Sequence, residues 1–113
     1  MSAGVWSVRL TAAAQADFEG ILRWTEGQFG RAQAHRYADT ISAALDTLTA
    51  GPAIPGATKR DDILEGIFAL HVARSSRKGR HFIMFRIGQT TDGDVSEVLR
   101  LLHDAMDLER HLP

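Results

Sequence analysis

The sequence contains no cysteine and no long apolar run. The absence of cysteine excludes disulfide bonds, thiolate catalysis and zinc sites built on cysteine. The apolar runs are far shorter than the roughly 20 residues that a membrane-spanning helix requires. The opening segment, MSAGVWSVRL, has neither a basic cluster nor a long apolar stretch, so we expect no signal peptide and a cytoplasmic location.

Acidic residues are missing from one part of the chain. The formal net charge is −1, which is far from the strong positive charge of proteins that bind nucleic acid mainly through phosphate contacts. However, the segment between Gly66 and Thr91 contains no Asp or Glu but has five basic residues, Arg74, Arg77, Lys78, Arg80 and Arg86. Such a basic segment can attract an anionic partner, or it can simply be the solvated tip of a hairpin.

The length of 113 residues fits one domain with one hydrophobic core, spanning residues 1–113. Segment 5–10, VWSVRL, alternates apolar and polar residues as a half-buried strand does. After Thr11, a possible helix cap, apolar residues recur at helical spacing as far as Phe29, and Gly30 can end this helix. A second helix follows and should end before AGPAIPG. Because the connection at Gly30 is short, the two helices should form an antiparallel hairpin.

Three later segments, 67–74, 81–87 and 95–103, are short and apolar and are separated by turn-forming residues, which indicates antiparallel strands. In the middle segment, Phe82 and Met84 lie on the face opposite Ile83 and Phe85. Both faces are largely apolar, so one should carry the helices and the other should remain free for the C-terminal segment or a partner. We therefore predict an α+β fold with an N-terminal strand, an antiparallel helical hairpin packed on a mainly antiparallel sheet, and a short C-terminal helical tail.

Three stretches, in this order, closely resemble the ParE branch of the RelE/ParE toxin superfamily: FGRAQAHRYADTISAALDTL, GRHFIMFR and VLRLLHDAMDLERHL. The resemblance covers about residues 5–112. It implies a toxin of a type II toxin–antitoxin pair, held inactive in a hetero-oligomeric complex with a ParD-like antitoxin. Toxins of the ParE branch characteristically poison DNA gyrase, whereas RelE-like toxins cut messenger RNA on the ribosome. A further alternative is a module that has lost toxicity and acts only as a binding partner or co-repressor.

A RelE-like ribonuclease that works without a metal would need a base, an acid and cations around the phosphate. His103 could be the base, and Arg74, Arg80 or Arg86 could hold the phosphate. Against this set, the second helix has no lysine, and its tyrosine lies on the predicted buried stripe. We therefore favour binding to a protein target such as gyrase over RNA cleavage. His103 is then a residue at the end of a strand, hydrogen-bonded to local backbone or a carboxylate.

The five histidines form no HExxH motif or comparable ligand spacing, so we expect neither a metal nor another cofactor. Trp24 lies about 110° from the apolar stripe of the first helix, at about 100° per residue, and should be partly exposed. Because exposed aromatic residues often anchor interfaces, we predict an antitoxin contact at Trp24, together with Phe82 and Met84 on the free sheet face. We expect no membrane association and no specific nucleic-acid binding by the toxin alone. The predicted target-binding residues are Arg74, Arg77, Lys78, Arg80, Asp107, Arg110 and His111.

Overall fold

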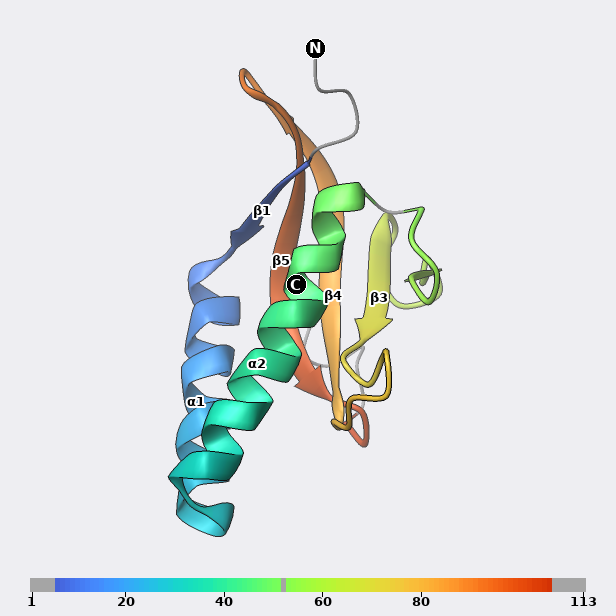
Figure 1. Cartoon of the computed structure of the whole chain (residues 1–113). Coiled ribbons are helices and arrows are strands. Elements are labelled where there is room, and N and C mark those ends of the chain that lie inside the picture. The colour runs from blue at the N-terminus through green and yellow to red at the C-terminus, as the bar shows by residue number, and fades with distance from the viewer. Residues whose placement is uncertain (1–5, 52, 107–113) are drawn as a thin grey trace.

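Two antiparallel helices lie against one face of a five-stranded sheet (Figure 1). The computed structural model describes residues 6–51 and 53–106. In chain order the elements are β1 (Ser7–Leu10), α1 (Ala12–Phe29), α2 (Arg31–Thr47), the 3-10 helix η1 (Leu48–Ala50), β2 (Thr58–Lys59), β3 (Ile67–His71), β4 (His81–Thr90) and β5 (Gly93–His103). The predicted α+β class and the predicted order of a strand, two helices and an antiparallel meander are confirmed.

The helical hairpin begins and turns where the sequence predicts. The Thr11 hydroxyl accepts a hydrogen bond of 3.1 Å from the backbone N–H of Ala14 and so caps α1. Gly30 lies between the two helices with a φ of 92°, a left-handed conformation that costs little for glycine. Its N–H donates to the carbonyl of Glu26 at 2.9 Å, and the chain enters α2 at the next residue. One glycine therefore makes the whole connection.

The sheet has the strand order β1-β5-β4-β3-β2. β3, β4 and β5 are antiparallel neighbours, whereas β1 pairs in parallel with β5, so the sheet is mainly antiparallel, as predicted. β4 and β5 are longer than expected, because Gly93, with a φ of 123°, permits a tight turn directly after Thr90. β3 ends at His71, whereas the prediction extended to residue 74. The short, exposed β2 has no apolar alternation, and the sequence pattern does not predict it.

A β-bulge between β4 and β5 decides which β5 side chains face the helices. The register shifts between Met84 and Phe85, so that Met84 pairs with Arg100 and Phe85 pairs with Val98. Along a regular strand side chains alternate, and Val98 and Leu101 would lie on opposite faces. With the bulge, both belong to the same buried cluster under the helices.

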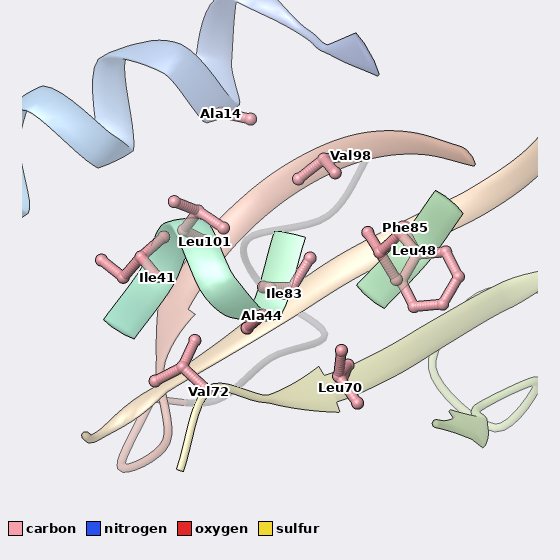
Figure 2. Close-up of a cluster of buried hydrophobic side chains, with 10 residues drawn as sticks. All are labelled: Ala14, Ile41, Ala44, Leu48, Leu70, Val72, Ile83, Phe85, Val98 and Leu101. Atoms are coloured by element: carbon pink, nitrogen blue, oxygen red, sulfur yellow. The ribbon is translucent and has the colours of Figure 1, made fainter. Parts of the chain in front are cut away.

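The main core fills the space between the helices and the sheet (Figure 2). Ile83 and Phe85 of β4 are fully buried there, as are Ile41 of α2 and Leu48. Burying one such side chain is worth about 1.5–3 kcal/mol, so this cluster fixes how the helices lie on the sheet. The predicted shared face of Ile83 and Phe85 is confirmed.

The other face of the sheet, which we expected to be free, carries a second buried cluster. Ile63 and Leu64, from the loop between β2 and β3, pack against it, and Phe82 is partly buried beside it. Met84 is 0% exposed, so the prediction that it lies on an open face of the sheet is wrong. The sequence pattern assigns no element to the segment just before β3, so it does not predict that two apolar residues there cover the sheet. The buried members of this cluster are Ile67, Ala69, Met84, Leu99 and Leu102.

After β5 the chain makes a turn over 104–106. Met106 N–H donates to the carbonyl of His103 at 3.0 Å, which closes this turn. The rest of the predicted helical tail lies outside the described residues. Within the described ranges, neither helix is long and apolar enough to cross a membrane.

Candidate functional site

A groove runs along one side of α1, at the place where β4 begins and β5 ends. It consists of two adjoining hollows of about 390 Å³ and about 490 Å³. Trp24, His81 and His103 line both hollows and so mark the middle of the groove. One hollow extends along α1 to Ala16, and the other extends to Phe29. We call this feature the Trp24 groove.

Two exposed aromatic rings form one wall of the Trp24 groove. Trp24 is 62% exposed and Phe29 is 65% exposed, and their rings meet edge to face with centroids 5.9 Å apart. The exposure predicted for Trp24 is confirmed. Phe29 was expected on the apolar stripe of α1. It is the last residue of α1, and the helical hairpin extends past the ends of β4 and β5 (Figure 1), so no strand of the described residues lies over this end of the helix.

The opposite wall contains a hydrogen-bonded pair, Tyr37 of α2 and His81 of β4. The Tyr37 hydroxyl lies 2.7 Å from His81 Nδ1 and also accepts a bond of 3.1 Å from the backbone N–H of Arg80. We therefore assign the Tyr37 hydroxyl as the donor to His81 Nδ1, with the imidazole proton on Nε2. A Cβ on Gly79 would lie 2.8 Å from Tyr37 Cε1, so only glycine lets the loop before β4 come this close.

Burial controls the protonation of both members of this pair. Burial, and after it repulsion from His103, lowers the pKa of His81 to about 4 from an ordinary 6.5. Burial also raises the pKa of the Tyr37 hydroxyl, although the hydrogen bond from the Arg80 backbone opposes this change. At neutral pH the pair is therefore uncharged, a tyrosine hydroxyl donating to a neutral imidazole.

His103 is the last residue of β5, directly opposite His81 in the strand register. Its Nδ1 accepts a hydrogen bond of 3.1 Å from the backbone N–H of Ala105, as predicted for a histidine at the end of a strand. Its ring meets that of His81 edge to face with centroids 5.2 Å apart, and 42% of its side chain is exposed. The structure thus gives His103 a local backbone partner and an exposed edge in the groove.

Asp104 ties together three segments beside the groove, a role that the sequence pattern does not reveal. Its carboxylate accepts from His71 Nε2 of β3 at 2.9 Å and from Arg80 Nε at 3.0 Å. Its backbone N–H donates to the Arg80 carbonyl at 2.7 Å. The hydrogen bond from His71, followed by that from Arg80, holds the pKa of the Asp104 carboxyl below its usual range. We call His71, Arg80 and Asp104 the Asp104 clamp.

The predicted basic surface is divided among different internal partners. The Arg74 side chain donates to the Pro55 carbonyl at 2.7 Å, and Arg80 belongs to the Asp104 clamp. Arg86 forms an ion pair of 2.8 Å with Glu97. Within the described residues, no carboxylate forms an ion pair with the two remaining cations of this segment, Arg77 and Lys78.

Comparisons with known proteins agree on one family. The family model described as ParE toxin of type II toxin-antitoxin system, parDE, matches residues 8–108. The chain belongs to the ParE toxin family. It is 35% identical to Toxin ParE of Escherichia coli over 91% of this chain and 89% of that protein. It is 34% identical to Toxin ParE1 of Mycobacterium tuberculosis, strain H37Rv, over 91% and 94% of the two chains.

A solved structure extends the likeness to the fold. The structure described as a chromosomal ParDE TA system from P. aeruginosa aligns with a TM-score of 0.70, over 89% of this chain and 98% of that one. The sequence identity is 17%, so this likeness speaks for the fold alone. The chain is thus a ParE-family toxin of the type II toxin–antitoxin class with the fold of its relatives.

In this ParE-family chain, the cations of the alternative nuclease set do not gather around His103. Arg86 forms an ion pair with Glu97. It lies five residues along β4 from His81, the register partner of His103, and this separation is roughly 17 Å at the rise of a strand. Arg74 lines neither hollow of the Trp24 groove, and only Arg80 does so. Among the described residues, no group of three or more His, Asp or Glu side chains could hold a metal ion. Three predicted target-binding residues, Asp107, Arg110 and His111, lie outside the described part of the chain.

Proposed function

We propose that this ParE-family toxin is neutralised by a ParD-like antitoxin and acts in the cytoplasm by poisoning DNA gyrase. The match to the ParE family over residues 8–108 carries this proposal. Gyrase is the characteristic target of the branch that the sequence resembles. The toxin would act by binding, so that DNA breaks made by gyrase persist and replication stalls.

The distribution of charges supports binding over RNA cleavage. A metal-free nuclease needs cations around the scissile phosphate, but Arg86 is distant from His103 and Arg74 is bonded to Pro55. Arg80 lies in the groove, yet its guanidinium already donates to Asp104. The remaining cations of the predicted target surface, Arg77 and Lys78, are exposed and available to a protein partner.

The antitoxin contact is proposed at the exposed edge of the helical hairpin. Trp24 and Phe29 together form an exposed aromatic pair, and large exposed aromatic residues commonly anchor interfaces. Phe82 is partly buried and could contribute only at the edge of this contact, whereas Met84 has no exposed surface to contribute. The antitoxin surface is therefore centred on α1 instead of the far face of the sheet.

Two assays on purified toxin test the proposed target. We expect the toxin to inhibit gyrase supercoiling of relaxed plasmid and to leave ribosome-bound messenger RNA intact. Toxin saturated with its antitoxin is the matched control and should leave supercoiling unchanged. Cleaved messenger RNA together with normal supercoiling would support the RelE-like ribonuclease instead. Normal growth of cells that express the toxin without its antitoxin would support a module that has lost toxicity.

A further inference from the structure

The middle of the Trp24 groove offers hydrogen-bond donors from two imidazoles. His81 accepts from Tyr37 at Nδ1, and its Nε2 has no hydrogen-bond partner among the described residues. Among the described residues every buried side-chain nitrogen or oxygen has a hydrogen-bond partner, so the unpaired His81 Nε2 is not fully buried, and His81 lines both hollows of the groove. His103 also accepts at Nδ1, from Ala105, which leaves its Nε2–H for an external acceptor.

The charges around these donors favour an anion. Lys78 and Arg80 line the same hollow as the two histidines. Asp17, in the neighbouring hollow, already accepts from Arg100 at 2.7 Å, and Asp104 is held in its clamp. The groove therefore suits a ligand with a single carboxylate. A polyanion such as single-stranded nucleic acid fits less well, because two carboxylates lie nearby and the net charge of the chain is −1.

The length and walls of the groove indicate a polypeptide segment. Along α1 the groove extends from Ala16 to Phe29, which is about 20 Å at the rise of an α-helix. Ile21 and Met106 line one hollow, and Trp24 and Phe29 line the other, so apolar surface lies on both sides of the histidines. A small anion would leave most of this surface uncovered. A helical segment of about 13 residues would cover it, as in other helix-in-groove complexes.

We infer that the Trp24 groove receives an amphipathic segment of the antitoxin and binds one carboxylate of that segment through the Nε2–H groups of His81 and His103. This inference rests on the proposed function, because it takes the antitoxin as the occupant. The apolar residues of the segment lie on Trp24 and Phe29 on one side and on Ile21 and Met106 on the other. One antitoxin position must then be Asp or Glu, with apolar neighbours at helical spacing.

Matched substitutions at His103 test whether its N–H donates a hydrogen bond to the antitoxin. His103→Phe keeps a ring but removes the N–H, and we expect it to weaken antitoxin binding about 10-fold or more, as for a lost hydrogen bond to a charged group. His103→Gln keeps an N–H donor and should restore most of the affinity. His35→Phe, on the exposed side of α2 outside the groove, is the control and should bind normally. Affinities are measured by titration with the antitoxin encoded beside the toxin, after melting curves show each variant folded.

Substitutions on the antitoxin identify the carboxylate. Each Asp or Glu in its toxin-binding half is changed to Asn or Gln, and we expect one change to weaken binding of wild-type toxin but not to weaken binding of His103→Phe further. Trp24→Ala should weaken binding about 30-fold without lowering the melting temperature. A melting temperature lowered by Trp24→Ala, with affinity unchanged, would mean that this ring only covers the core edge and would overturn the inference.

The inference is also overturned if His103→Phe binds the antitoxin like wild type, if every antitoxin carboxylate acts independently of His103, or if a single-stranded oligonucleotide displaces the antitoxin from the groove. Failure of the proposed function looks different. In that case the wild-type toxin binds its antitoxin through His103 and Trp24 but leaves gyrase unaffected. If the neighbouring protein does not bind wild-type toxin at all, both the antitoxin pairing and this inference fail.

Discussion

Two carboxylates of the sheet have similar partners but different surroundings. Glu97, within β5, accepts from arginines of the two neighbouring strands, each at 2.8 Å. Asp104, just after β5, accepts from His71 at 2.9 Å and from Arg80 at 3.0 Å. In both cases these hydrogen bonds lower the pKa of the carboxyl. The two sites therefore have similar chemistry at two positions in the same sheet.

The difference lies in what else holds the partners in place. Arg9 and Arg86 are the direct register neighbours of Glu97, so backbone pairing already fixes all three residues. Arg80 and Asp104 lie just outside β4 and β5, where their side chains add to a single backbone bond of 2.7 Å. Similar ion pairs are thus redundant within the sheet and structurally important at its end. The Trp24 groove is at that end, so small changes there should have large effects.

The largest effect should come from one added methyl group at the end of the sheet. In Gly79→Ala the new Cβ would lie 2.5 Å from Val72 Cγ2 and 2.8 Å from Tyr37 Cε1, and we expect a loss of about 2 kcal/mol or more in the free energy of unfolding. Gly27→Ala, in open space on α1, is the control and should stabilise the protein by about 0.5–1 kcal/mol. Urea denaturation measures both. A tolerated Gly79→Ala would contradict the close packing of this loop.

Acidification should lower the free energy of unfolding first through His81 and only at lower pH through the carboxylates of Glu97 and Asp104. The pKa of His81 is about 4 when folded and 6.5 ordinarily, so below about pH 6.5 only the unfolded chain takes up this proton. Stability then falls as the pH decreases toward 4, by about 2 kcal/mol between about pH 7 and about pH 5. The stabilisation from Glu97 and Asp104, whose pKa values are lowered, is lost mainly below this window.

Substitutions test whether His81, and not another histidine, causes this pH dependence of stability. In urea denaturation at several pH values, His81→Phe should make stability nearly independent of pH between about pH 7 and about pH 5, whereas His35→Gln should keep the wild-type slope. An unchanged slope in His81→Phe would show that another group is responsible. The uncharged state assigned to the Tyr37 and His81 pair would then be wrong.

A smaller difference should separate the two carboxylates themselves. Glu97→Gln should change the free energy of unfolding by no more than about 1 kcal/mol, as for other surface ion pairs within a sheet. Asp104→Asn should destabilise the protein more and should also weaken antitoxin binding, because Arg80 and the end of β5 lose their common partner. Equal effects of the two substitutions would remove the contrast between the middle and the end of the sheet.

Much of the fold could be predicted because its signals are local. The Thr11 cap, the Gly30 turn and the alternation around Ile83 each depend on a few neighbouring residues, and all are confirmed. The parallel pairing of β1 with β5 and the bulge beside Met84 depend on contacts between distant segments, which periodicity does not encode. For the same reason, the cover over the far face of the sheet could not be predicted.

The site was predictable only in part. The position of Trp24 on the helical wheel indicated its exposure, and the end of β5 indicated a local bond for His103. The hydrogen bond between Tyr37 and His81 joins residues 44 positions apart, and no spacing in the sequence predicts it. A usable signal did exist for the histidines, because antiparallel strands that begin at His81 and end at His103 place those two residues opposite each other.

The most direct test of binding over RNA cleavage is the His103→Gln variant in both activity assays. Glutamine keeps a hydrogen-bonding group but cannot act as a base at neutral pH, and removing a general base usually costs about 10²–10⁴-fold in rate. Wild type and variant are titrated in parallel against gyrase supercoiling and against ribosome-bound messenger RNA. We predict inhibition of supercoiling within about 3-fold of wild type and intact messenger RNA for both proteins. Messenger RNA cleavage by wild type that disappears in folded, antitoxin-binding His103→Gln would contradict the account and establish a ribonuclease.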